Sequence, residues 1–329
     1  MFNQKTILIT GGTGSFGQKA TSYLIANYKS VKIIIYSRDE MKQWQMNLKF
    51  NENKKLKYII GDVRDKERLL FALNNVDYCI HAAATKIVPT AEINPSECIK
   101  TNVIGAMNVI DACIVKNVKK VVALSTDKAC SPVNLYGASK LASDKLFTSS
   151  SINNHKSKTK FSVVRYGNVM GSRGSVIPFF LDKLENNEQL PITSKKMTRF
   201  MITLEEAVKF VMFSLKDMKG GEIYIKKIPS IKIIDIAKAV KKNIKYKIIG
   251  IRPGEKIHEQ MISEDDSIYT FEFKNHFIIN SSNLKRKYTT GKKVPSGFQY
   301  SSDKNTNWLD VDELKYWIIK NKKTFLKNN

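Results

Sequence analysis

Short apolar runs alternate with longer segments of helical spacing through the first half of the chain. The runs lie at residues 5–10, 31–37, 55–62, 76–83, 119–126 and 161–168. Strands that alternate with helices form a parallel sheet covered on both faces, and such a sheet binds its ligands at the carboxyl ends of its strands. The sequence therefore predicts an α/β fold with a doubly wound, Rossmann-type parallel sheet.

The alternation ends after about residue 168, where the glycine- and proline-containing stretch "GNVMGSRGSVIPFF" begins. Segments with helical spacing follow at 203–218 and 231–242, and then a polar tail. We expect residues 1–167 to form the Rossmann domain and residues 168–329 to form mainly a smaller C-terminal substrate-binding lobe. Segments at about 201–218 and 229–242 are expected to pack back on the first domain.

The formal net charge of +25 is spread along the 329 residues and carried mostly by lysine. This distribution indicates a biased composition rather than a nucleic-acid-binding surface, so we expect no nucleic-acid partner. The four cysteines have no C-x-x-C pairing and no histidine at metal-ligand spacing. They are therefore predicted to be reduced core thiols, and no metal site is expected.

No segment comes close to the roughly 18 uninterrupted apolar residues of a membrane span. The chain also enters an apolar strand by about residue 5, without a basic and then apolar leader. We therefore expect a soluble, cytoplasmic protein with no membrane partner.

The segment "ITGGTGSFG" follows the first strand and opens a helix. Glycines in this position permit a tight turn and a close backbone approach, so that a pyrophosphate can sit on the amides of a helix N-terminus. The position of the motif at the first strand-to-helix junction favours a dinucleotide site over a simple turn. The candidate contacts are Gly11, Thr13, Gly14, Ser15, Phe16 and Gly17.

The end of the second strand indicates which dinucleotide is bound. An NAD site usually offers a carboxylate to the ribose hydroxyls, whereas Ser37 and Arg38 offer a hydroxyl and a guanidinium suited to a 2′-phosphate. NADP is therefore favoured, although Asp39 keeps the NAD alternative open. Further candidate contacts at the strand ends are Lys42, Asp62, Val63, Ala82 and Lys86.

Tyr136 and Lys140 lie four residues apart and would share one face of a helix. A tyrosine has a reference pKa of ~10, and roughly 4 kcal/mol of phenolate stabilisation would make it a useful base near neutrality. A neighbouring ammonium and a positive nicotinamide ring can supply that stabilisation. The pair predicts proton removal from an alcohol and contact with the cofactor.

Asp127 and Lys128 stand at the end of the fifth strand, directly after Thr126. A simple alcohol oxidation needs one proton acceptor, so an additional acid and amine indicate further proton transfers. Adjacent residues of a strand point to opposite sides, and we therefore expect the two side chains to have separate roles.

These blocks resemble the extended short-chain dehydrogenase/reductases. More closely, "YSRDE", "GDVRD", "STDKA", "NLYGASK", "VVRYGNVMGSRGSVIPFF", "MTRF" and "IRPGEK" resemble the inverting UDP-N-acetylglucosamine 4,6-dehydratases that start pseudaminic acid biosynthesis. The similarity runs over about residues 3–310. It implies a homo-oligomer, with a hexamer as the suggested form, and a role in surface glycan or flagellin glycosylation.

The resemblance implies a role for each residue at the end of the fifth strand. Tyr136 would take the proton of the sugar C4 hydroxyl, NADP+ would take the hydride, and Thr126 would hydrogen-bond the C4 oxygen. Lys128 would then remove the C5 proton and Asp127 would protonate the departing C6 hydroxyl. The hydride returns to C6, and a proton delivered to the opposite face inverts C5.

These two roles require unusual protonation states. Lys128 has to lose its proton and Asp127 has to hold one, against reference pKa values of ~10.4 and ~3.9. Burial shifts both pKa values in the required direction, whereas pairing between the two side chains would oppose both shifts.

The resemblance also nominates residues for the nucleotide sugar. Arginines suit bidentate contact with a diphosphate, and an asparagine offers a donor and an acceptor to a sugar. In "AATKIVP", Thr85 and Ile87 stand where the family usually has Leu and His, which bears on details of substrate contact. The nominated residues are Lys86, Asn168, Arg199, Arg252 and Glu255.

Other functions of the same fold remain open. They are a C5-retaining dehydratase, an epimerase or a reductase acting on a nucleotide sugar, and a non-catalytic NADP-sensing protein. Asp127 and Lys128 argue against the epimerase and the reductase, which need no eliminating pair. Tyr136 and Lys140 argue against a sensor, because sensing alone needs no proton acceptor.

Overall fold

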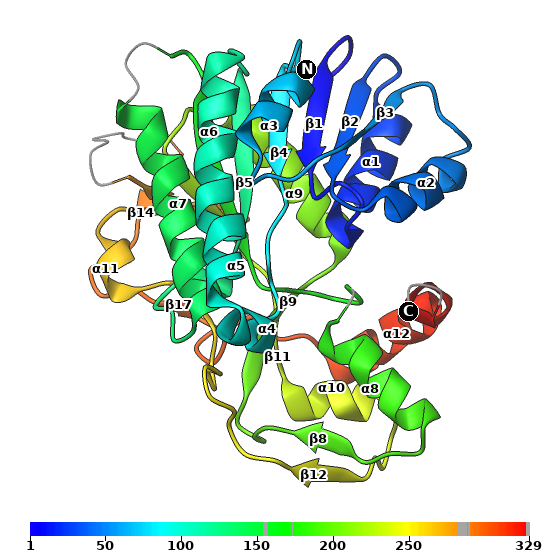
Figure 1. Ribbon diagram of the computed structural model, residues 1–329. Coiled ribbons are helices and arrows are strands. Elements are labelled where there is room, and N and C mark those ends of the chain that lie inside the picture. Colours follow the sequence, from blue (N-terminus) through cyan, green and yellow to red (C-terminus); the bar gives the residue numbers. More distant parts are fainter. Residues whose placement is uncertain (154–156, 173, 282–287, 289, 327–329) are drawn as a thin grey trace.

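The fold is built on a ten-stranded sheet in the order β16-β14-β15-β10-β6-β5-β4-β1-β2-β3 (Figure 1). The computed structural model describes the whole chain except residues 154–156, 173, 282–287, 289 and 327–329. The strands that pair in parallel are β1 (Thr6–Thr10), β2 (Lys32–Ser37), β3 (Leu56–Ile60), β4 (Tyr78–His81), β5 (Lys120–Thr126), β6 (Lys160–Tyr166) and β10 (Glu222–Lys226). The antiparallel strands at one edge are β14 (Thr270–Glu272), β15 (His276–Asn280) and β16 (Lys292–Lys293).

Helices cover both faces of this sheet, so the predicted doubly wound α/β fold is confirmed. On one face, α6 packs against α3 and α7, while α1 packs against α9 on the other. Apart from edge strand β3, the strands between them are mostly apolar and buried, as expected for a parallel sheet with two covered faces. The helices of these layers are α1 (Ser15–Asn27), α2 (Glu40–Lys49), α3 (Lys66–Ala72), α6 (Gly105–Val115), α7 (Leu135–Asn153) and α9 (Leu204–Asp217).

A nearly continuous helical stretch lies between β4 and α6 in the chain. It consists of α4 (Val88–Ile93), α5 (Pro95–Ile99) and a π-helical turn at Lys100–Ile104. Within the described residues, Pro95–Val115 is the one helical stretch long and apolar enough to cross a membrane, and half of its apolar window is buried in the protein. Its contacts with α3 and α7 account for that apolar character, because a core helix of an α/β layer has the same composition.

The second lobe has its own core, below the sheet in Figure 1. Buried side chains such as Ile177, Phe180, Ile236 and Leu314 meet there. Its helices are α8 (Val176–Glu185), α10 (Ile233–Val240) and α12 (Val311–Leu326). Its strands are β7 (Asn168–Val169), β9 (Thr198–Ile202) and β11 (Ser230–Lys232) in one small sheet, and β8 (Leu190–Ile192) and β12 (Tyr246–Ile248) in another.

The division of the later half differs in part from the expectation. Helix α9 packs on α1, β5 and β6, as expected for segment 201–218. Segment 229–242 does not pack on the first domain: β11 pairs with β9, and α10 packs on α8 and α12. The reason is that the apolar face of α10 completes the second core. The later half also supplies β10 and the antiparallel edge to the main sheet, so the chain passes repeatedly between the two parts.

The four cysteines are buried and free of disulfides, as expected for core thiols. Within the described residues, no group of three or more histidine, cysteine, aspartate or glutamate side chains could hold a metal ion.

Candidate active site

The glycine loop connects β1 to α1 with backbone that only glycine adopts easily. Gly11 has a φ of +63°, and a Cβ added there would lie 2.9 Å from the backbone of Ala83. A Cβ on Gly17 would lie 2.2 Å from the carbonyl oxygen of Gly12. The turn is closed by a 2.9 Å hydrogen bond from the Gly14 amide to the Gly11 carbonyl.

Helix α1 begins at Ser15 without a side-chain cap, so its first amides are not covered by a capping oxygen. Exposed amides at a helix N-terminus, combined with a close glycine approach, fit a dinucleotide pyrophosphate. Thr13 is buried within the loop, and Phe16 packs against the main core. The loop therefore has a geometry that fits a dinucleotide pyrophosphate.

The chain after β2 carries the cations Arg38 and Lys42, and the carboxylate of Asp39 is hydrogen-bonded to α2. Asp39 caps α2 by accepting from the Lys42 amide at 2.9 Å, and it also accepts from Lys42 Nζ at 2.6 Å. These hydrogen bonds from Lys42 lower the pKa of Asp39. The Arg38 side chain is 64% exposed, with Nη1 3.9 Å from Asp62 Oδ2. Ser37 is almost buried, and its Oγ accepts from Gln43 Nε2 at 3.0 Å.

The neighbouring strand ends line the same edge of the sheet. Asp62 follows β3, and its carbonyl accepts from the Tyr36 hydroxyl at 2.7 Å. Val63 is buried after it. Ala82 follows β4, and its amide donates to Thr10 Oγ1 at 3.1 Å. Lys86 is exposed four residues further along the chain.

Tyr136 and Lys140 lie on the first turns of α7, and both are buried. Lys140 Nζ donates to the Leu124 carbonyl at 2.7 Å, which holds its ammonium beside β5. Burial raises the pKa of Tyr136 to about 12, against the opposing effects of Lys128 and of a hydrogen bond with Thr126. Burial lowers the pKa of Lys140, and Asp144 opposes that shift. The phenol thus keeps its proton until further positive charge reaches it.

A buried ion pair between Asp144 and Arg165 lies close to Lys140. Asp144, one helical turn beyond Lys140, accepts from Ser125 Oγ at 2.8 Å and from Arg165 Nη2 at 3.2 Å. Arg165 in turn donates to the Met261 carbonyl at 2.8 Å. Asp144 and Arg165 were not predicted as site residues from the sequence. Asp144 lies four residues after Lys140, as Lys140 lies four residues after Tyr136.

Asp127 and Lys128 point toward each other, contrary to expectation. Lys128 Nζ lies 3.1 Å from Asp127 Oδ1, and Asp127 is fully buried. The strand alternation does not apply because the chain turns into a 3-10 helix at Asp127–Ala129 directly after β5. Thr126 caps this turn and also donates to Asp127 Oδ1 at 2.9 Å.

The electrostatics of the pair follow from this contact. Burial raises the pKa of Asp127, and Lys128 opposes the shift. Burial alone would lower the pKa of Lys128, but the carboxylates of Asp127 and Glu259 outweigh it and raise that pKa. The pKa of Lys128 is therefore raised, whereas the proposed role as base requires it to fall.

Glu259 is a partner of Lys128 that was not predicted from the sequence. It precedes β13 (Gln260–Ile262), which pairs with β17 (Tyr300–Ser301) and leads to α11 (Glu264–Ser267). Glu259 Oε1 lies 3.0 Å from Lys128 Nζ. No local sequence pattern marks Glu259 as a site residue. It lies far along the chain from Lys128 and three residues beyond the "IRPGEK" block.

Arg199 is held by the protein itself. Its Nε lies 3.6 Å from Glu259 Oε1, and its Nη atoms donate to the carbonyls of Thr198, Lys256 and Ile257. Arg199 was nominated as a diphosphate contact, but the structure places it, buried, in the ion-pair cluster. Asn168 also joins the cluster, since its Oδ1 accepts from Lys128 Nζ at 3.4 Å.

Arg252 and Glu255 lie on the loop after β12 and form an ion pair with each other. The Arg252 side chain is 61% exposed, while Glu255 also accepts from Thr193 Oγ1 at 3.4 Å. Glu255 thus anchors the exposed guanidinium to the second lobe.

Two buried carboxylate oxygens of the cluster lack a hydrogen-bond partner among the described residues. They are Asp127 Oδ2 and Glu259 Oε2. Buried polar atoms are nearly always hydrogen-bonded, so unpaired acceptors in a cluster of this kind suit donors on a ligand, such as sugar hydroxyls.

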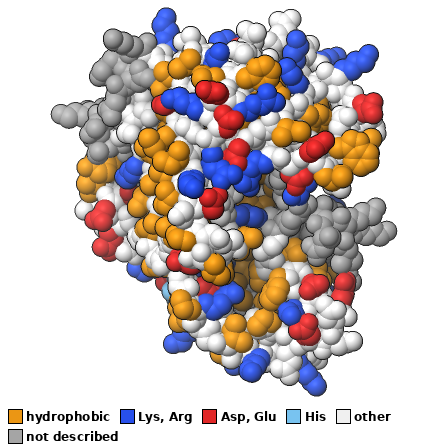
Figure 2. All heavy atoms as spheres, in the orientation of Figure 1, with side chains coloured by type: hydrophobic (Ala, Val, Ile, Leu, Met, Phe, Trp, Pro, Cys, Tyr) orange, Lys and Arg blue, Asp and Glu red, His pale blue; other side chains and the backbone are white. Residues whose placement is uncertain are grey.

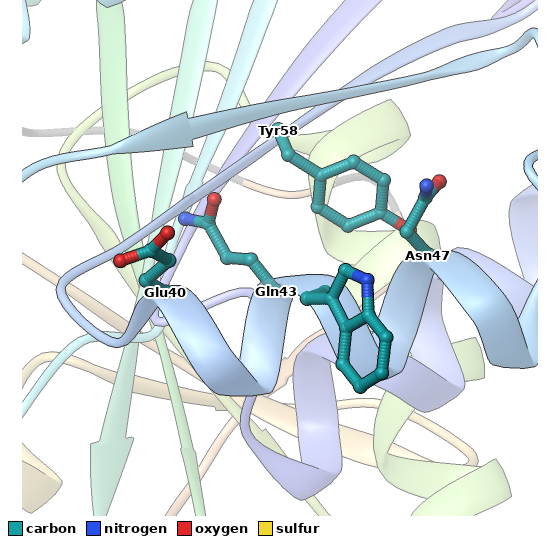
Figure 3. Close-up of a pocket in the computed structure, with 5 residues that line it drawn as sticks. Glu40, Gln43, Asn47 and Tyr58 are labelled. Carbon is teal, nitrogen blue, oxygen red and sulfur yellow. The ribbon is translucent and has the colours of Figure 1, made fainter.

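A separate hollow is lined by α2 and by edge strand β3 (Figure 3). Gln43 extends into it from α2 and Tyr58 from β3. The cluster stands at β5, which three strands (β4, β1 and β2) separate from β3 in the sheet. The hollow is therefore no part of the candidate active site. Its lining residues are Glu40, Gln43, Trp44, Asn47 and Tyr58.

Comparison with known proteins shows the family. A family model described as "Polysaccharide biosynthesis protein" matches residues 7–281. The chain belongs to this polysaccharide biosynthesis family. The matched residues include the glycine loop, the α7 pair and the whole Asp127–Lys128–Glu259 cluster.

Relatives within and around this family cover nearly the whole chain. The inverting UDP-N-acetylglucosamine 4,6-dehydratase of Campylobacter jejuni subsp. jejuni (strain 81-176) is 57% identical over 95% of this chain and 97% of that protein. UDP-glucose 4-epimerase of Rickettsia bellii (strain OSU 85-389) is 41% identical over 97% of this chain and 96% of that protein. The X-ray structure of Pen from Bacillus thuringiensis has a TM-score of 0.91 and 39% identity, covering 98% of this chain and 99% of that one. The resemblance to the inverting dehydratases, with their extended short-chain dehydrogenase/reductase fold, is confirmed.

Proposed function

We propose that this chain is an NADP-dependent UDP-N-acetylglucosamine 4,6-dehydratase that inverts C5. The observation that carries the proposal is a buried acid, Asp127, paired with a partly exposed amine, Lys128, near Tyr136 at the carboxyl end of β5. The similarity to the Campylobacter jejuni dehydratase supports the same activity. Its product would be UDP-2-acetamido-2,6-dideoxy-β-L-arabino-hex-4-ulose.

The first step is oxidation at C4. A nicotinamide cofactor bound on the glycine loop supplies the hydride acceptor and later the hydride donor. Tyr136 removes the proton of the C4 hydroxyl, and we assign Thr126 as a hydrogen-bond partner of the C4 oxygen. The Lys140 ammonium, held at the Leu124 carbonyl, stabilises the phenolate form of Tyr136. We assign Tyr136 and Lys140 to cofactor contact as well.

The second step is loss of water across C5 and C6. The C4 ketone makes the C5 proton acidic, so that an amine can remove it. Lys128 is the base, and Asp127 is the acid that protonates the departing C6 hydroxyl.

The Asp127–Lys128 contact supplies the required protonation states without proton uptake. The ammonium–carboxylate pair holds as many protons as the reactive pair of neutral amine and carboxylic acid. One proton has to pass from Lys128 Nζ to Asp127 Oδ1 across 3.1 Å. When Lys128 has taken the C5 proton and Asp127 has lost its own, the pair is again an ammonium and a carboxylate.

For the nucleotide sugar, we propose contacts from both parts of the chain. Lys86 follows β4, Asn168 stands beside Lys128, and Arg252 extends from the second lobe with Glu255 behind it. The exposed guanidinium of Arg252 suits the diphosphate. Arg199 contributes from within the cluster by orienting Glu259.

The product made in heavy water tests the function. Wild-type protein given UDP-N-acetylglucosamine in D2O should place deuterium at C5 of a 4-keto-6-deoxy sugar with inverted configuration. The hydrogen moved from C4 to C6 should carry no solvent label. Nuclear magnetic resonance of the early product reads both positions, and protein stripped of cofactor is the control. A retained C5 configuration would identify a retaining dehydratase, and a C4 epimer with no loss of water would identify an epimerase.

We assign NADP, rather than NAD, to the site because Asp39 is used as a helix cap while Arg38 and Lys42 supply positive charge. Asp62, Val63 and Ala82 would line the remainder of the cofactor.

Arg38→Ala should weaken NADP binding about 10- to 100-fold, which corresponds to the roughly 1.5–3 kcal/mol of a hydrogen bond to a charged group. NAD binding should change much less, because NAD lacks the 2′-phosphate. Calorimetry on cofactor-stripped protein measures both affinities. Lys49→Ala, which removes a cation at the far end of α2, is the matched control. Equal losses for NADP and NAD would remove Arg38 from this role.

Self-association is a further part of the proposal. Ile93, Ile99, Ile104 and Met107 are all exposed, from 37% for Ile99 to 79% for Ile93. Figure 2 shows an apolar strip over α5 and α6, where these elements lie in Figure 1. Exposed apolar surface of this kind supports a homo-oligomer, and a hexamer is the form that the family resemblance suggests.

We also propose a cytoplasmic location and a role in making pseudaminic acid for surface glycans or flagellin. A nucleotide-sugar substrate and a reduced state of the four buried cysteines support that location. Basic side chains on the face in Figure 2 are interspersed with acidic ones, which supports the absence of a nucleic-acid partner. The contacts of Pro95–Val115 with α3 and α7 support the absence of a membrane partner.

A further inference from the structure

Glu259 is fixed in place by backbone contacts from a distant part of the chain. Its amide donates to Ser302 Oγ at 2.9 Å, and its carbonyl accepts from the Ser302 amide at 2.8 Å. The residue is 1% exposed, so its carboxylate cannot turn out into water. Burial of a carboxylate is costly unless it is paired, and the structure provides Lys128 and Arg199 as its partners.

The cluster brings carboxylates and cations into direct contact. Two carboxylates, Asp127 and Glu259, face two cations, Lys128 and Arg199. Lys128 and Arg199 both approach Glu259 Oε1, so this carboxylate separates two like charges that would otherwise repel. Without Glu259, Arg199 would act on Lys128 as an uncompensated positive charge.

Three oxygen acceptors surround Lys128 Nζ. They belong to Asp127, Glu259 and Asn168, at 3.1, 3.0 and 3.4 Å. An ammonium has three N–H bonds and can serve all three acceptors. When one proton passes to Asp127, the neutral amine keeps two N–H bonds, and Glu259 and Asn168 are left to hold them.

We propose that Glu259 is a positioning residue that orients Lys128 and sets the pH range in which the Lys128–Asp127 pair carries out the elimination. The inference rests on the proposed dehydratase function and goes beyond it by adding a third ionisable group. In the elimination, the C5–H bond breaks as an N–H bond forms on Lys128. The C6–O bond breaks as Asp127 supplies a proton, a C5–C6 double bond forms, and one water leaves. Glu259 exchanges no proton in this step.

The direction of the pH effect follows from the charges. The Glu259 carboxylate favours the protonated form of Lys128 and disfavours the ionised form of Asp127, so it raises the pKa of both groups. Removing its charge should lower both pKa values and move both limbs of the pH profile to lower pH. The charged and titratable groups around Lys128 are Asp127, Tyr136, Arg199, Lys256 and Glu259.

Glu259→Gln tests the inference, because glutamine keeps the size of the side chain and removes its charge. Single-turnover experiments over a range of pH would follow C4 oxidation by the absorbance of the reduced nicotinamide. Elimination would be followed by the appearance of the dehydrated sugar. Both limbs of the elimination profile should move down by about one pH unit, the smaller end of the shift caused by a neighbouring charge. The C4 oxidation should keep its wild-type pH dependence.

Two further variants complete the test. Glu259→Asp keeps the negative charge but moves it away by one methylene. Both limbs of the pH profile of this variant should therefore move to lower pH by a smaller amount. Glu222→Gln is the matched control, since Glu222 is also buried but lies at the amino end of β10, where Ser162 and two backbone amides donate to it. Its pH profile should match the wild type. Thermal unfolding of every variant reports whether it is folded.

Unmoved limbs in both Glu259 variants would overturn the inference, as would equal losses of oxidation and elimination with no pH shift. The second result would mean that Glu259 only stabilises the fold. A wild-type protein that forms no dehydrated sugar would instead contradict the proposed function, so the two failures can be told apart.

Discussion

Lys128→Ala and Asp127→Asn are each expected to stall the reaction after C4 oxidation, with the hydride left on the cofactor and no water released. Lys128 removes the C5 proton and Asp127 protonates the leaving hydroxyl, so either loss blocks the elimination. General acid–base groups contribute about 100- to 10,000-fold each, and the elimination rate should fall by that factor. Reduced nicotinamide absorbance and the dehydrated sugar, measured in the same single turnover, check the result.

The two variants differ in their effect on stability. Lys128→Ala leaves Asp127 and Glu259 as buried carboxylates without their shared ammonium. Breaking a buried ion pair in this way costs about 3–5 kcal/mol. Asp127→Asn keeps the shape of the side chain and is the milder change. Thermal unfolding separates a loss of fold from a loss of chemistry, and near-normal dehydration by both variants would reject the assigned acid and base.

Tyr136→Phe is expected to abolish C4 oxidation, because the phenol oxygen is the acceptor of the hydroxyl proton. The rate of cofactor reduction should fall by about 100- to 10,000-fold. Lys140→Ala should impair the same step and weaken cofactor binding, since its ammonium supports the phenolate. Stopped-flow absorbance of the reduced nicotinamide measures the step directly.

Tyr300→Phe is the control for this substitution. Tyr300 is also buried, and its hydroxyl bonds only the backbone of Ile228 among the described contacts, so its removal should leave C4 oxidation intact. Rapid reduction of the cofactor by substrate in Tyr136→Phe would remove Tyr136 from the role of base.

Sequence alone determined the parts of this protein that depend on local pattern. The alternation of apolar runs with helical segments specifies β1 to β6 and the helices between them, because burial on both faces of a parallel sheet requires near-continuous apolar strands. The glycine loop is equally local, since the positive φ of Gly11 and the close contact at Gly17 depend on glycine at those positions. Tyr136 and Lys140 share a helix face because their spacing equals one helical turn.

Only the tertiary structure decided how the charges at the site are paired. Asp127 and Lys128 face each other because the chain leaves β5 through a 3-10 turn, which the strand pattern did not predict. Glu259 contacts Lys128, and Arg199 contacts Glu259. Both come from segments that are distant in the sequence, next to β13 and in β9. The pKa of each group depends on its burial and on the charges next to it, and both are properties of the assembled fold. The packing of α10 on the second core could also not be predicted from its own apolar face, because that face does not specify its partner helices.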